Sequence, residues 1–334
     1  STRVIIVSKS FTTLETTMNA KAVVNWLKDS GCSQSDITSA LYAVTANVPA
    51  ASAFGIAEEN IFPFWDWVGG RYSVWSAVGL PIALQYGFKA FQEFLAGAEA
   101  MDLHFKNAPL EENLPVIMAL ALLHQQKIHG ITSYAAIPYA DALDWFPKWL
   151  QQLDMESNGK SVDRDGKPVQ YSSPVVFGSA GSNAQHSYFQ MLHQGTEIIP
   201  IDFIAVREPM SDRPEAVAHH RILLSNCLAQ AQALANGKGA SNPNDVYPGQ
   251  RPSNLLLLPK LNAFYLGALL ALYENRTASL GALWNINSFD QPGVEYGKVL
   301  AKPIEKALAS HANNIAASEH IDAVTAARIN YLNS

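Results

Sequence analysis

Residues 4–15, VIIVSKSFTTLE, join a β-branched run to a hydroxyl-rich turn and to the start of a helical pattern. The run at residues 4–7 predicts a buried strand. Thr12 followed by Glu15 has the form of a capping box, which predicts that the helix begins on the turn. The apolar residues that recur at helical spacing after the turn are Met18, Ala22, Val23 and Trp26. The stretch therefore predicts a strand, a loop and a helix, the repeating unit of parallel α/β sheets.

The same alternation continues along the 334 residues, a length that suggests about two domains. Apolar runs predict strands at residues 41–45, 133–137, 174–177 and 198–206. Periodic patterns predict helices at residues 88–105, 115–123 and 215–235. The aromatic, turn-rich residues 61–72 predict a loop that leads into a helix near Ser73. We expect an α/β protein with parallel sheets flanked by helices.

Composition excludes several classes of protein. The chain is 48% hydrophobic with a net charge of −6 and no basic cluster, which favours a globular protein without a nucleic-acid partner. The two cysteines, Cys32 and Cys227, predict no disulfide framework and favour a cytoplasmic setting. The longest apolar stretches, residues 114–123 and 263–273, are shorter than the roughly 20 residues that cross a bilayer. We therefore expect a soluble protein with no membrane partner.

The turn at residues 8–13 could bind an anion. It offers four hydroxyl groups, the Lys9 ammonium and the backbone N–H groups of a helix start. The four hydroxyl groups belong to Ser8, Ser10, Thr12 and Thr13. Two interpretations stay open here, a phosphate site or a helix entry that is merely rich in Ser and Thr. The chain has no G-x-x-x-x-G-K-[ST] motif, which disfavours a nucleoside triphosphatase.

Other candidate groups are weaker on their own. Residues 178–185, GSAGSNAQ, follow a predicted strand but lack the G-x-G-x-x-G spacing of a dinucleotide site, so a nicotinamide-dependent oxidoreductase is disfavoured. His186 is expected at the start of the next helix, and no third ligand at metal spacing accompanies the histidines. Asp154 and Glu156 lie in a polar stretch, residues 154–160, that predicts a turn with solvated carboxylates. Lys298 is by default a lysine on a helix surface.

Six motifs, taken together and in order, resemble the glucose-6-phosphate isomerase (phosphoglucose isomerase) family. They are SKSFTTLET at 8–16, GGRYSVWS at 69–76, QLDMESNGK at 152–160, GSNAQH at 181–186, HQGT at 193–196 and FDQPGVEYGK at 289–298. The resemblance implies two sugar-isomerase (SIS) domains with parallel sheets between helices, and a homodimer whose active site is shared between subunits. It also implies an aldose–ketose isomerase that interconverts glucose 6-phosphate and fructose 6-phosphate in glycolysis and gluconeogenesis, without metal or cofactor.

The resemblance also implies a role for each site residue. Ser8, Ser10 and Thr13, with Lys9 through its backbone, hold the substrate phosphate. Glu156 moves a proton between C2 and C1, and Arg71 lies beside the enediolate. His186 and Lys298 open the sugar ring, and Gln152 contacts the substrate. The alternative is a sugar-phosphate-binding regulator on the same fold, which has no use for the acid and base residues.

Compared with the family, the chain lacks a helical N-terminal region and an early Gly-Ser loop, so we expect a carboxyl-terminal portion with an incomplete first domain. The expected division is the later part of the first SIS domain at 1–85, a linking helix at 86–113, the second SIS domain at 114–300 and a helical tail at 301–334. Pro292 and Leu14 stand where many members carry Trp and Gln. Both positions flank the motifs and leave the expected roles intact.

Overall fold

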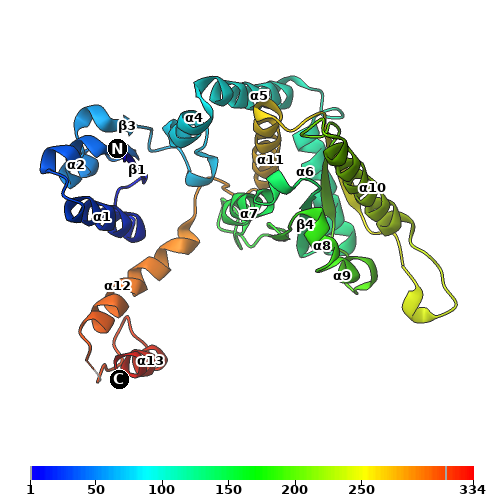
Figure 1. The fold of residues 1–334 in the computed structure, drawn as a ribbon. Coiled ribbons are helices and arrows are strands. Elements are labelled where there is room, and N and C mark those ends of the chain that lie inside the picture. Colours follow the sequence, from blue (N-terminus) through cyan, green and yellow to red (C-terminus); the bar gives the residue numbers. More distant parts are fainter. Residues whose placement is uncertain (1, 313) are drawn as a thin grey trace. The chain divides into compact units, whose positions relative to one another are not determined.

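The computed structural model describes residues 2–312 and 314–334 (Figure 1). Its contacts divide the chain into a larger unit, Ser1–Ser288, and a smaller unit, Phe289–Ser334. The larger unit contains parallel sheets flanked by helices, so the expected α/β class is confirmed. The domain boundaries expected at residues 85, 113 and 300 stay predictions.

The first sheet has the strand order β1-β2-β3. Its strands are β1 (Val4–Val7), β2 (Leu41–Thr45) and β3 (Ile61–Pro63). All pairs are parallel, with Val7 opposite Val44 and Thr45 opposite Pro63. Helices α1 (Leu14–Asp29), α2 (Gln34–Ala40) and α3 (Val48–Phe54) connect the strands and share their core. Parallel pairing places the ends of β1 and β2, and hence Ser8, at the carboxyl edge of this sheet.

The second sheet has the order β5-β4-β6-β7, again with every pair parallel. Its strands are β4 (Ser133–Pro138), β5 (Val175–Phe177), β6 (Ile201–Val206) and β7 (Ser253–Leu258). Every residue of β6 is buried, as expected for a parallel strand covered on both faces. The predicted strands at 41–45, 133–137, 174–177 and 198–206 are therefore confirmed. The last two begin later than predicted, at Val175 and Ile201.

Helices cover both faces of the second sheet (Figure 1). One face packs against α6 (Leu114–His129), α7 (Phe146–Gln151) and α11 (Ala263–Leu283). The other packs against α8 (Gly181–Gln185), α9 (Phe189–Gln194) and α10 (Pro214–Asn236). Two separate apolar cores result, which hold the sheet between them. The sheet therefore provides a rigid support for the loops at its carboxyl edge.

Helix α5 (Phe88–Asn107) confirms the helix predicted at residues 88–105. It crosses α11 at very short range. A Cβ atom on Gly97 would lie 1.8 Å from the carbonyl oxygen of Phe264, and one on Gly267 would lie 2.0 Å from that of Phe94. Only glycine permits this approach of the two backbones. Helix α4 (Leu80–Tyr86) precedes α5.

The smaller unit consists of α12 (Glu295–Ala309) and α13 (Ala323–Asn333), preceded by a 3₁₀ turn at Pro292–Val294. Its core is small and contains Ile321, Ala326 and Ile329. Among the described residues of the whole chain, no helix has the length and apolar character needed to cross a membrane.

Three sequence-based expectations are wrong in detail. The residue at the N-cap of α1 is Thr13, not Thr12, and no side chain caps the helix, so the capping box is absent. Met18 and Trp26 are 60% and 53% exposed, because α1 turns a different face toward the sheet. The helix expected near Ser73 is replaced by 3₁₀ turns at Gly70–Tyr72 and Ala77–Gly79, and α4 begins only at Leu80.

Candidate active site

Arg71 is a buried cation that contacts two other parts of the chain, residues 156–157 and Ser288. Its Nε donates to Ser157 Oγ at 2.7 Å, and its Nη2 donates to the carbonyl oxygen of Ser288 at 2.7 Å. Its Nη1 lies 3.7 Å from Glu156 Oε2. The Arg71 side chain is 2% exposed, whereas that of Glu156 is 23% exposed. A fixed guanidinium thus faces a carboxylate that solvent, or a substrate, can still reach.

Glu156 lies at the end of a π-helical turn, Gln152–Glu156, that continues directly from α7. The expected turn at residues 154–160 is therefore wrong at its start, because the helix extends through the acidic residues. Asp154 is buried, so the expectation that it is solvated is also wrong. Isolated π turns are uncommon and are often found at functional sites. The wide turn directs Asp154 into the protein and Glu156 toward Arg71.

Asp154 is part of a buried polar cluster. It forms an ion pair with Arg276 and accepts a hydrogen bond from Thr277 Oγ1. Arg276 Nη1 also donates to Tyr134 Oη at 3.0 Å. Burial disfavours the charged guanidinium, but the neighbouring Asp154 raises the pKa of Arg276 above its usual value. Burial raises the pKa of Tyr134 far above its usual value, and the negative charge of Asp202 adds to the effect.

Asn158 and Ser288 extend the contacts around Arg71. Asn158 Nδ2 donates to the carbonyl oxygen of Thr277 at 2.8 Å, and Ser288 Oγ donates to Asn158 Oδ1 at 2.6 Å. Gly281 makes room for this pair, since a Cβ there would lie 1.9 Å from Ser288 Oγ. Sequence reasoning missed Asn158, Arg276 and Ser288 as parts of the site. Asn158 lies within a motif quoted above, but no local signal marks Arg276 or Ser288.

The hydroxyl-rich turn leaves the carboxyl edge of the first sheet and enters α1. Ser10 Oγ and Thr12 Oγ1 are 2.7 Å apart, and the carbonyl oxygen of Lys9 accepts from Thr45 Oγ1 at 3.1 Å. Ser8 Oγ is buried and has no hydrogen-bond partner among the described residues. Thr13 is the N-cap residue of α1, and its side chain makes no capping hydrogen bond. The turn therefore presents hydroxyl and amide groups that an anion could use.

The remaining candidates lie on the surface. Gln152 is exposed at the first position of the π turn. His186 is exposed and follows the last residue of α8, so it ends a helix instead of starting one as expected. Within the described part of the chain its side chain has no hydrogen bond or ion pair. Lys298 lies in the smaller unit, where its Nζ pairs with Glu295 Oε1 at 2.8 Å.

The described residues thus place one accessible carboxylate beside a buried guanidinium. A second group, the turn at residues 8–13, presents hydroxyl and amide groups. Among the described residues, no group of three or more His, Cys, Asp or Glu side chains is arranged to hold a metal ion. The contacts bring Arg71 and Glu156 together, and they bring Ser8, Lys9, Ser10 and Thr13 into one turn. Such a set suits proton transfer next to a developing negative charge in an anionic substrate.

Comparisons with known proteins agree with this chemistry. The sequence profile of the family described as phosphoglucose isomerase matches residues 1–329. The chain is 51% identical over 321 residues to "Glucose-6-phosphate isomerase 2" of Cupriavidus pinatubonensis, covering 92% of this chain and 59% of that protein. It is 49% identical over 313 residues to a glucose-6-phosphate isomerase of Dechloromonas aromatica, covering 90% of this chain and 59% of that protein.

Solved structures agree with the fold. A crystal structure of a glucose-6-phosphate isomerase from Chlamydia trachomatis superposes with a TM-score of 0.82 at 37% identity, covering 92% of this chain and 60% of that one. A hypothetical protein from Thermus thermophilus superposes with a TM-score of 0.74 at 29% identity, covering 90% of this chain and 71% of that one. The chain spans about 60% of the length of the curated relatives described above.

Proposed function

Since the chain belongs to the phosphoglucose isomerase family, we propose that it interconverts glucose 6-phosphate and fructose 6-phosphate. The observation that carries the proposal is the position of the accessible Glu156 carboxylate 3.7 Å from the buried guanidinium of Arg71. Aldose–ketose isomerisation needs one base that removes a proton from C2 and returns it to C1. A carboxylate beside a fixed cation suits that task.

In the proposed reaction, Glu156 takes the C2 proton of the open-chain aldose and an enediolate forms. The negative charge develops on the sugar oxygens, where a permanently charged guanidinium stabilises it without exchanging a proton. Glu156 then returns the proton to C1, and the carbonyl group is left at C2. Arg71 is pre-organised for this role, because Ser157 and Ser288 hold it before any substrate binds.

We assign the substrate phosphate to the turn at Ser8, Lys9, Ser10 and Thr13. The unpartnered Ser8 Oγ and the uncapped start of α1 support the assignment, because both offer donors for an anion. Binding the phosphate far from the reacting carbons positions them for proton transfer. Gln152 is proposed to contact the substrate from the same turn as Glu156.

Ring opening needs a base at O1 and an acid at O5, and we assign these roles to His186 and Lys298. An imidazole has both a proton donor and a proton acceptor, so it can act in either direction. His186 is exposed, and its side chain forms no hydrogen bond or ion pair among the described residues of its own chain. This supports a homodimer in which His186 acts in the site of the neighbouring subunit. A cytoplasmic enzyme and the division into two SIS domains belong to the same proposal.

The test compares the 334-residue chain with its Glu156→Gln variant in a coupled assay of fructose 6-phosphate conversion. We expect the variant to lose activity by about 10²–10⁴-fold, the usual contribution of a general base. Binding of 6-phosphogluconate, followed by calorimetry, should change little because the phosphate contacts remain. Glu112→Gln, an exposed carboxylate on a loop, is the matched control and should keep full activity.

Two outcomes would contradict the proposal. Unchanged turnover in Glu156→Gln would exclude Glu156 as the base. Failure of the unmodified chain to convert either sugar phosphate would mean that these residues alone do not form an active isomerase.

A further inference from the structure

We propose that Arg276 is a positioning residue for Glu156, acting through Asp154. Arg276 lies on α11, and among the described residues its polar partners are Asp154, Tyr134 and Asp202 instead of Glu156 or Arg71. It would act by holding the π-helical turn in the register that directs Glu156 toward Arg71. The inference rests on the proposed function, because it concerns the base of that reaction.

The contact between Arg276 and Asp154 is completely buried, with the side chains 1% and 3% exposed. Removing two charges from water costs so much free energy that such a pair is poor evidence of a stabilising role. A pair retained at this position therefore calls for another explanation. Asp154 is two residues before Glu156 in the same turn, which places the pair beside the proposed base.

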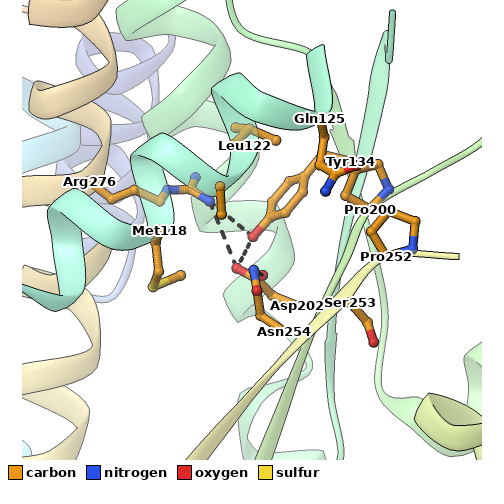
Figure 2. A pocket seen from close by; sticks show the side chains of 11 residues that line it. Met118, Leu122, Gln125, Tyr134, Pro200, Asp202, Pro252, Ser253, Asn254 and Arg276 are labelled. Carbon is orange, nitrogen blue, oxygen red and sulfur yellow. Dashed lines mark hydrogen bonds and ion pairs between the residues drawn. The ribbon is translucent and has the colours of Figure 1, made fainter. Parts of the chain in front are cut away.

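Arg276 is anchored to the centre of the second sheet (Figure 2). Tyr134 on β4 accepts a hydrogen bond from Arg276 Nη1, and Tyr134 Oη in turn donates to Asp202 on β6. Tyr273 Oη donates to the same Asp202 oxygen at 2.7 Å, and Asn254 Nδ2 donates to its other oxygen at 2.7 Å. Asp202 also lies 3.9 Å from Arg276 Nη1. The sheet thus fixes one end of the guanidinium.

Arg276 packs against the rings of Tyr134 and Tyr273 but borders a cavity on another side. A cavity of about 160 Å³ lies beside it, lined among others by Met118, Leu122, Gln125 and Asn254. Figure 2 shows the Arg276 guanidinium extending across this space toward Tyr134. Its Nε has no hydrogen-bond partner among the described residues. Loss of the contact with Asp154 would leave the side chain room to move.

The opposite end of the connection is the π turn. One Asp154 oxygen pairs with Arg276 and the other accepts from Thr277, so α11 holds both oxygens of the carboxylate. The next contacts along the chain are those of Ser157 and Asn158, which reach Arg71 and Thr277. A change at Asp154 therefore shifts the segment that carries Glu156. At 3.7 Å, the separation of Glu156 from Arg71 is not fixed by a hydrogen bond of its own.

The first test is Arg276→Met in the full 334-residue chain. We expect kcat for fructose 6-phosphate to fall by about 10²-fold, the effect of misplacing a reacting group by about 1 Å. KM should stay within about threefold, because the phosphate turn is untouched. Asp154→Asn removes the charge of the other partner. It should likewise lower kcat strongly and leave KM nearly unchanged.

Arg276→Lys is the conservative variant. A lysine keeps the positive charge toward Asp154 but loses the second donor that reaches Tyr134. If positioning acts through Asp154, this variant should recover at least about a tenth of the original kcat, well above Arg276→Met. Equal loss of kcat in both variants would contradict the proposed connection.

Leu234→Ala separates positioning from simple destabilisation. Leu234 is buried in the core on the other face of the second sheet and contacts none of these polar residues. Its truncation should lower the melting temperature about as much as loss of the buried pair does. Its kcat should nevertheless stay within about threefold of the original value. If kcat falls in step with the melting temperature across all four variants, including Leu234→Ala, loss of stability explains the loss of activity and the proposal is overturned.

Crystal structures of the original chain and of Arg276→Lys and Asp154→Asn test the inference without any turnover. The expected result is a displaced π turn and a longer Glu156–Arg71 distance in Asp154→Asn, with the original geometry kept in Arg276→Lys. An unchanged turn in Asp154→Asn would overturn the positioning role. If the original chain is inactive but the turn is still displaced in Asp154→Asn, the result contradicts the proposed function and leaves the positioning role intact.

Discussion

Glu274, a half-buried residue on α11 whose Oε1 is buried, supports the segment that carries Arg71. It accepts a hydrogen bond from Trp75 Nε1 at 2.8 Å, and Trp75 stacks on Phe94 with ring centroids 4.7 Å apart. Burial raises the pKa of Glu274 to about 8, and the negative charge of Asp102 adds to the shift. Glu274 is therefore mostly protonated in the folded protein at neutral pH.

This shift predicts a pH dependence of stability. The pKa is 4.5 when unfolded and about 8 when folded, so the folded state binds more protons between these values. The contribution of Glu274 is fully present below about pH 4.5 and is lost as pH rises toward 8. We expect a decline of up to about 1.4 kcal/mol per pH unit in that window.

Glu274→Gln should remove this part of the decline, because the amide keeps an oxygen for Trp75 and does not titrate. Urea unfolding at several pH values between 5 and 8 measures the difference. Glu112→Gln, at an exposed position, should keep the original slope. Parallel slopes for the original chain and Glu274→Gln would show that Glu274 does not titrate in this window.

At the residue scale, motifs predict which residues lie together better than they predict how buried each one is. The quoted stretches contain both Arg71 and Glu156, and the structure brings them within 3.7 Å. The burial of Asp154 could not be predicted, since its partner Arg276 is 122 positions away in the sequence. A carboxylate in a polar stretch gives no local sign that a distant helix will neutralise it.

At the level of elements, the crossing of α5 and α11 depends on paired glycines. Gly97 and Gly267 each lie against a carbonyl oxygen of the opposite helix. The crossing fixes the position of α11, which also carries Glu274, Arg276 and Thr277. Through these three residues α11 contacts the segment that carries Arg71 and the turn that carries Glu156. Because backbone atoms of the two helices touch at these glycines, no side chain can be added there unless the helices move apart.

Gly267→Ala should therefore destabilise the fold. The added Cβ would lie 2.0 Å from the carbonyl oxygen of Phe94, so the helices must separate. We expect the free energy of unfolding to fall by about 1–3 kcal/mol, the usual cost of overpacking. Urea unfolding measures this change. Gly239→Ala, where an added Cβ meets nothing within 4 Å, should have no such effect, and equal stability of both variants would contradict the close crossing.

The elements themselves are predictable where burial follows a simple period. β2, β4 and β6 are apolar runs covered on both faces, and α5 has one apolar face. Errors occur where tertiary contacts override local preference. Thr12 and Glu15 match a capping box, yet Ser10 contacts the Thr12 hydroxyl and the helix starts later. The π turn likewise depends on contacts with α11.

At the scale of the whole molecule, the proposed shared site makes a prediction about mixtures. Glu156→Gln and His186→Ala should each be nearly inactive alone, since each lacks one proposed catalytic group in every site. If His186 serves the neighbouring subunit, a mixed dimer contains one site with both groups intact. Random exchange of subunits should then restore about a quarter of the original activity.

The measurement is a coupled assay after mild dissociation and reassociation of the two variants at equal concentration. Mixing Glu156→Gln with a doubly substituted Glu156→Gln/His186→Ala chain is the control and should restore nothing. If the first mixture also stays inactive although dimers exchange, His186 serves its own chain or has no catalytic role.

The order of the motifs along the chain predicts the family and the parallel α/β fold, and both are confirmed over nearly the whole chain. The assembly of the site is harder to derive. His186 carries no local sign of which chain it would serve, because an exposed imidazole after a short helix has the same sequence pattern in either case.

The wide turn at Gln152–Glu156 has one last consequence. If it tightened to an α-helix, the residues after it would rotate by about one helical step, roughly 100° about the axis. Such a change of register would turn Glu156 away from Arg71 altogether, a larger effect than the displacement of about 1 Å considered above. A variant in which both registers occur would contain two coexisting populations of the protein, and only one of them would have Glu156 beside Arg71.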